Sequence, residues 1–205
     1  MRFRSPSFNP ILGGVVACFV LSGFAALLYQ TAWLRQFSLV FGTSELAVAA
    51  VLAAYMGGLS LGAAVAARYV HRITRPVLFY GLLEAGIAIS ALAVPLLLQL
   101  ARVVYVAVLG GQPEPADASG LGQSFFYLIV AFIVLAIPTT FMGATLPLLT
   151  KYVVKSEAQI GTRVGLLYAT NTIGAIGGTL VAGFVLLPLL GLNGTVWAGV
   201  AINLV

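Results

Sequence analysis

Long apolar runs alternate with short polar breaks along the whole chain, and this alternation predicts a bundle of membrane-spanning helices. A helix needs about 20 apolar residues to cross the hydrocarbon core of a bilayer. We therefore expect an all-α polytopic membrane domain over residues 11–205, preceded by a tail over residues 1–10. The apolar runs predict about six helices, at 11–34, 45–67, 77–100, 124–149, 164–187 and 192–205.

The last of these runs is shorter than the others. A helix of about 14 residues extends about 21 Å at 1.5 Å per residue, whereas the hydrocarbon core is about 30 Å thick. We expect residues 192–205 to form an incomplete helix, which a continuing chain or a neighbouring subunit would extend.

The composition indicates that lipid, not water, surrounds these helices. The 205 residues are 61% hydrophobic and 7% charged, whereas soluble globular domains carry about 25% charged residues. The formal charge of +5 does not indicate a nucleic-acid partner, because the basic residues lie between the apolar runs and form no basic stripe. Cys18 is the only cysteine, and the sequence has no metal-ligand cluster or nucleotide-binding motif. We therefore assign no catalytic residue, metal or cofactor to this chain and expect the lipid bilayer as its main partner.

The charges in the breaks predict the orientation of the bundle. The break between residues 110 and 122 contains Glu114 and Asp117 and no Lys or Arg. Under the positive-inside rule, the basic breaks and the N-terminus lie in the cytoplasm and the acidic break lies outside. Arg102 lies toward the outer end of its helix, from which its long stem can reach the interface. The basic breaks contain Arg68, His71, Arg72 and Arg75, and Lys151, Lys155 and Arg163.

Tyr29 and Trp33 lie near the outer end of the first predicted helix. Membrane helices are enriched in Tyr and Trp at the two membrane–water interfaces. The pair therefore predicts an aromatic belt at the outer interface.

Small residues recur at every fourth position in two of the runs. Lipid supplies no hydrophobic force between helices, so close backbone approach has to hold them together. We therefore expect two tight helix–helix contacts. Their small residues are Ala50, Ala54, Gly58 and Gly62 in the second run and Gly174 and Gly178 in the fifth.

Glu84 is a carboxylate inside the third apolar run. It lies eight residues after Pro76, or about 12 Å deep, where a charge costs several kcal/mol unless it is protonated, paired or hydrated. Asn171 lies at a similar depth in the fifth run. We expect Glu84 and Asn171 to share one polar pocket, with Tyr55 and Thr140 as further lining residues.

Two interpretations of this pocket follow from the residues. In the functional interpretation, Glu84 relays protons or binds a cationic substrate. In the structural interpretation, a protonated Glu84 joins neighbouring helices through a hydrogen bond.

Four stretches together resemble the membrane portion of bacterial fused major-facilitator/spermidine-synthase-like proteins. They are LSGFAALLYQTAWLRQFSLVFG (21–42), AAYMGGLSLGAAVAARYVHR (53–72), MGATLPLL (142–149) and GLLYATNTIGAIGGTLVAGFVLLPLLG (165–191). The resemblance implies a half-major-facilitator-like bundle in the bacterial inner membrane. It also implies a soluble aminopropyltransferase-like domain as partner, whose catalytic motif is not in these residues.

Three functions are compatible with these observations. The chain is the membrane module of a spermidine synthase-like protein, which anchors the soluble domain or exchanges substrate with it. Alternatively, it is a half-transporter that works as a homodimer on a small cationic solute, or a structural subunit of a membrane complex. Enzyme activity would require the aminopropyltransferase-like domain that the resemblance implies.

Overall fold

The computed structural model describes residues 10–109 and 121–205, and these form helices with no β-strand among them. This confirms the predicted all-α class. Six α-helices follow one another, with short 3₁₀ turns at Val70–Arg72 (η1) and Glu157–Gln159 (η2) and a π-helical turn at Ala182–Leu186 (η3). The α-helices are α1 (Pro10–Phe41), α2 (Glu45–Tyr69), α3 (Pro76–Leu109), α4 (Leu121–Val153), α5 (Ile160–Val181) and α6 (Leu187–Asn203).

Five helical segments of the described chain are long and apolar enough to cross a membrane, and the fifth extends from Glu157 to Asn203. Large apolar side chains also lie on the outside of the bundle, including Ile89 (72% exposed), Phe184 (80%) and Leu189 (76%). An apolar outer surface of this extent suits contact with lipid. The protein is therefore a multi-pass membrane protein.

Local signals explain where several of the helices begin and end. The side chain of Ser44 accepts a hydrogen bond from the backbone N–H of Ala47 and so caps the start of α2. Proline is favoured in the first turn of a helix, and α3 begins at Pro76. Gly42, with a φ of 81°, follows the last residue of α1. α1, α3 and α4 are longer than the predicted apolar runs, whereas α5 ends at Val181, before the predicted end at residue 187.

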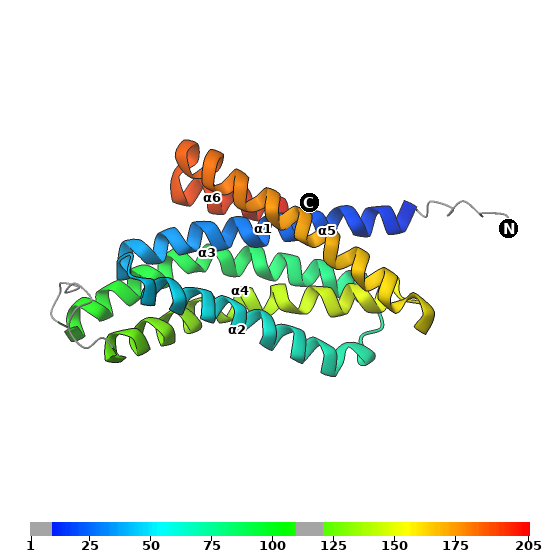
Figure 1. The fold of residues 1–205 in the computed structure, drawn as a ribbon, viewed down its shortest axis with the longest axis horizontal. Coiled ribbons are helices and arrows are strands. Elements are labelled where there is room, and N and C mark those ends of the chain that lie inside the picture. Colours follow the sequence, from blue (N-terminus) through cyan, green and yellow to red (C-terminus); the bar gives the residue numbers. More distant parts are fainter. Residues whose placement is uncertain (1–9, 110–120) are drawn as a thin grey trace.

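The fifth segment reverses direction at Gly191. Pro188 lacks a backbone N–H and its ring crowds the carbonyl group four residues earlier, and the helix widens into the π-turn η3 at this point. Gly191 then adopts φ 67° and ψ −172°, a conformation outside the helical range. Residues 192–203 consequently return along α1 and α3, and the C-terminal end of the described chain lies near the middle of the bundle's long axis (Figure 1).

The glycines of α2 lie against the backbone of α4. A Cβ atom at Gly58 would collide with the side chain of Thr139, and a Cβ at Gly62 would collide with the carbonyl group of Thr140. Ala50 and Ala54 on the same face of α2 are buried. The regular spacing of small side chains thus brings the two helices into backbone contact.

A second pair of glycines brings α5 against α1. A Cβ atom at Gly174 would collide with the carbonyl group of Val20, and one at Gly178 with the carbonyl group of Phe24. Figure 1 shows α5 and α6 beside α1 at one edge of the bundle, with α2 and α4 toward the other edge.

Lys151 joins the two basic breaks at one end of the bundle. Its ammonium group, in the last turn of α4, donates to the carbonyl oxygens of Val70 (2.7 Å), His71 (3.1 Å) and Ile73 (2.7 Å). These carbonyl groups belong to the turn between α2 and α3, where no backbone N–H of a following α-helical turn is available to them. The two loops therefore lie on the same side of the membrane.

The predicted aromatic belt at Tyr29 and Trp33 is wrong. Both side chains are 0% exposed, and their rings stack at a centroid distance of 5.1 Å in the interior of the bundle. Periodicity along α1 did not indicate which face is turned toward α3 and α6.

Candidate functional site

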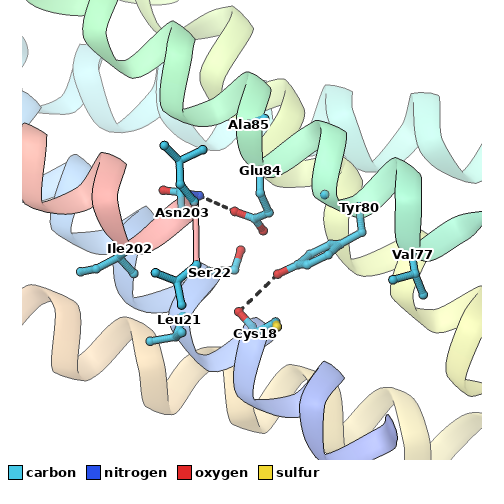
Figure 2. Close-up of a pocket in the computed structure, with 12 residues that line it drawn as sticks. Cys18, Leu21, Ser22, Val77, Tyr80, Glu84, Ala85, Ile202 and Asn203 are labelled. Atoms are coloured by element: carbon cyan, nitrogen blue, oxygen red, sulfur yellow. Dashed lines mark hydrogen bonds between the residues drawn. The ribbon is translucent and has the colours of Figure 1, made fainter.

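Glu84 lies in a small cavity where α1, α3 and α6 meet. The cavity has a volume of about 270 Å³. The carboxylate of Glu84 comes from α3 and accepts a hydrogen bond from the side-chain amide of Asn203, at the end of α6. Figure 2 shows Ser22 of α1 and Tyr80 of α3 beside the same carboxylate. Each of these four side chains is less than 10% exposed.

Tyr80 also fixes one wall of the cavity. It lies four residues before Glu84, so the two side chains are on the same face of α3. Its hydroxyl group donates to the backbone carbonyl of Cys18 on α1, at 3.3 Å. This bond joins α1 to α3 directly below the carboxylate (Figure 2).

The hydroxyl groups of Ser22 and Tyr80 lie beside the Glu84 carboxylate and interact with it. Two buried oxygen atoms of the cavity nevertheless accept no hydrogen bond of good geometry from the described residues. They are Oε1 of Glu84 and Oδ1 of Asn203. Both are acceptors, and leaving a buried polar atom unpaired costs about 1–3 kcal/mol. No Lys, Arg or His is among the residues that line the cavity. The site therefore lacks a donor that carries positive charge.

This arrangement suits a small group with several N–H donors. An ammonium group offers three donors and a charge opposite to that of a carboxylate. The rest of the wall is apolar and comes from residues such as Leu21, Val77 and Ile202, so an alkyl chain attached to that ammonium group would also be accommodated. The described residues contain no group of three or more His, Cys, Asp or Glu side chains that could hold a metal ion.

Asn171 does not line this cavity. Its amide group donates to the backbone carbonyl of Phe19 at 3.1 Å, and its backbone lies against Gly23. Asn171 therefore contacts α1 close to Ser22 along the helix axis. It does so on the face of α1 that packs against α5. The amide that contacts Glu84 is that of Asn203.

Tyr55 and Thr140 lie between other helices. The hydroxyl group of Tyr55 donates to the carbonyl of Ala26 (3.1 Å) and to Sδ of Met142 (3.6 Å). The backbone carbonyl of Thr140 contacts Gly62 at the junction of α2 and α4. Neither residue is among those that line the Glu84 cavity.

The sequence contained only weak signals for the residues that complete the site. Tyr80 has the four-residue spacing to Glu84 that predicts a shared helix face. Ser22 is a common residue in apolar helices, and Asn203 lies on a segment whose direction depends on the turn at Gly191. The position of Asn203 therefore could not be predicted before the turn was known.

Comparisons of this chain with protein-family models, with curated proteins and with solved structures gave no match.

Proposed function

We propose that the chain is a membrane module whose Glu84 cavity binds the ammonium group of a small amine. The observation that carries this proposal is the pair of buried, unpartnered acceptors, Oε1 of Glu84 and Oδ1 of Asn203, in a cavity without a basic lining residue. A charged amine would supply a positive charge that the lining lacks, and N–H donors aligned with both oxygen atoms.

The resemblance to spermidine-synthase-like membrane proteins supports a polyamine as the amine. In this proposal the bundle is half-major-facilitator-like and has about six membrane helices, with the N-terminus and the two basic loops in the cytoplasm of a bacterial cell. The module would anchor an aminopropyltransferase-like soluble domain or exchange substrate with it.

Binding to purified protein tests the ammonium site. The Glu84→Gln variant keeps an oxygen that can accept the hydrogen bond from Asn203 but loses the negative charge. We expect it to fold like the wild type and to bind spermidine at least about tenfold more weakly, because a charge-assisted hydrogen bond contributes about 1.5–3 kcal/mol. Isothermal titration calorimetry in detergent micelles measures the affinity.

The matched control is Glu157→Gln, which removes one carboxylate from an exposed loop turn outside the cavity. Equal spermidine affinity in the wild type and both variants would contradict the proposal. It would leave Glu84 with a structural role as the hydrogen-bond acceptor that joins α3 to α6.

A half-transporter for a small cation is the second candidate. The observation that favours it is the depth of the site, because Glu84 lies about 12 Å from the start of α3. A solute bound there lies inside the hydrocarbon core, which is about 30 Å thick, and not at its surface. Uptake of labelled spermidine by proteoliposomes above the level of empty vesicles would support transport, and binding without uptake would support the anchoring module.

A further inference from the structure

A second polar cavity lies at the end of the bundle opposite Lys151. It has a volume of about 430 Å³ and is formed by α1, α3 and the turn at Gly191. This volume is in the range of small-molecule sites. None of its lining residues is shared with the Glu84 cavity. Its polar lining residues are Gln36, Gln99, Arg102 and Asn193.

Gln36 supplies a buried acceptor in this cavity. The residue is only 7% exposed, and its side-chain oxygen Oε1 has no hydrogen-bond partner among the described residues. A buried carbonyl oxygen without a donor is costly, and water or a ligand normally satisfies it. Because Gln36 lines the cavity, a bound molecule with an N–H or O–H group could supply that donor.

Arg102 supplies positive charge at the same place. Its guanidinium group forms no ion pair with any carboxylate in the part of the chain that the structure describes, and the residue is exposed. A guanidinium group presents N–H donors in a planar fork that matches the two oxygens of a carboxylate or phosphate. Arg102 can thus bind an oxyanion, whereas the buried Oε1 of Gln36 needs a hydrogen-bond donor.

The turn at Gly191 places the remaining polar groups. The chain reverses at this residue of positive φ, and Gly191, Leu192 and Asn193 line the cavity. Gln99 lies three residues before Arg102, so the two share a face of α3. Both amide side chains can donate to an oxyanion and accept from a neighbouring donor.

We propose that this Gln36 cavity is a second binding site, for a carboxylate or phosphate group that also carries an adjacent hydroxyl or amine donor. The oxyanion would bind Arg102 and the donor would bind Oε1 of Gln36. A soluble hydroxycarboxylate and the headgroup of a phosphatidylethanolamine lipid both have this chemistry.

Paired probes that differ only in the donor test the site. The protein in phosphatidylcholine nanodiscs is titrated with lactate and with propionate, which lacks the hydroxyl group. We expect lactate to bind more tightly by a factor on the order of ten, since a site built to bind a hydroxyl group discriminates against the analogue without it. Gln36→Leu should reduce lactate binding to the level of propionate, and Arg102→Gln should weaken both by at least about tenfold.

The matched control is Arg35→Gln. Arg35 is the residue next to Gln36 on α1, is exposed and does not line the cavity. Like Arg102→Gln, this variant therefore loses one positive charge at that end of the bundle. We expect it to bind like the wild type. Gln36→Leu fills a similar volume and removes an unpaired acceptor, so its unfolding temperature should not fall. Arg102→Gln changes an exposed residue, so a loss of binding in this variant cannot be attributed to a disturbed core.

Native mass spectrometry distinguishes the two sources of the oxyanion. If a lipid headgroup is the ligand, the wild type and Arg35→Gln will retain phosphatidylethanolamine in preference to phosphatidylcholine, and Arg102→Gln and Gln36→Leu will not. Tighter lactate binding with no lipid preference would identify a soluble ligand. The proposal is overturned if Arg102→Gln and Arg35→Gln behave alike toward lactate, propionate and both lipids.

Discussion

Buried polar atoms differ in whether they have a hydrogen-bond partner, and this difference separates structural residues from candidate binding residues. Tyr55 and Tyr29 illustrate the difference, since each has a buried aromatic ring. The hydroxyl group of Tyr55 has two partners, whereas the hydroxyl group of Tyr29 has none among the described residues. Burial alone therefore does not identify a functional residue, and an unpartnered atom beside a cavity is the stronger indication.

Replacing each tyrosine by phenylalanine tests this distinction. Tyr55→Phe removes a satisfied donor and should lower the free energy of unfolding by about 1 kcal/mol. Tyr29→Phe removes an unpaired buried hydroxyl group and should leave the free energy unchanged or raise it by about 1 kcal/mol. Unfolding in mixed detergent micelles measures both. A loss for Tyr29→Phe as large as that for Tyr55→Phe would mean that the Tyr29 hydroxyl group has a partner.

At the scale of the helices, both cavities depend on the turn at Gly191. Residues on the two sides of it contribute Leu190 and Asn193 to the Gln36 cavity, and the returning helix carries Asn203 to Glu84. A change in this turn should therefore affect two sites that share no lining residue.

Gly191→Ala tests the conformational requirement of the turn. The φ of 67° with ψ near 180° belongs to a region that is almost restricted to glycine, and strain there costs about 1–3 kcal/mol. We expect a lower unfolding temperature and weaker binding of spermidine. Gly183→Ala is the control, because this glycine is helical and a Cβ there would meet no atom within 4 Å. Equal stability of the two variants would show that the turn does not need glycine.

The apolar runs and the spacing of small residues predicted much of the fold, but not which helices are neighbours. The apolar runs predicted an all-helical membrane chain because their length matches a bilayer, and spacing predicted that α2 and α5 approach other helices closely. Their partners, α4 and α1, depend on the complementary surfaces of two segments and cannot be derived from one. For the same reason Asn171 was expected beside Glu84, since depth can be counted along a helix but the face cannot.

For the whole molecule, the contacts of Lys151 determine which loops share a side of the membrane. Cysteines introduced at His71 and at Lys155, in a Cys18→Ser background, both lie at exposed positions of the two basic breaks. We expect a membrane-impermeant maleimide to label both from the cytoplasmic side, in inverted vesicles and not in intact spheroplasts. Labelling of the two positions from opposite sides would contradict the packing of the loops against Lys151.

The pairing of α2 with α4 and of α1 with α5 also constrains how the chain is made. During synthesis α1 and α2 leave the ribosome well before their glycine-matched partners exist. Neither helix can use its glycine-matched partner while it inserts, which agrees with two-stage assembly, in which helices insert before they pack. The backbone-to-backbone contacts can therefore form only late in biogenesis, after the second half of the chain has been inserted.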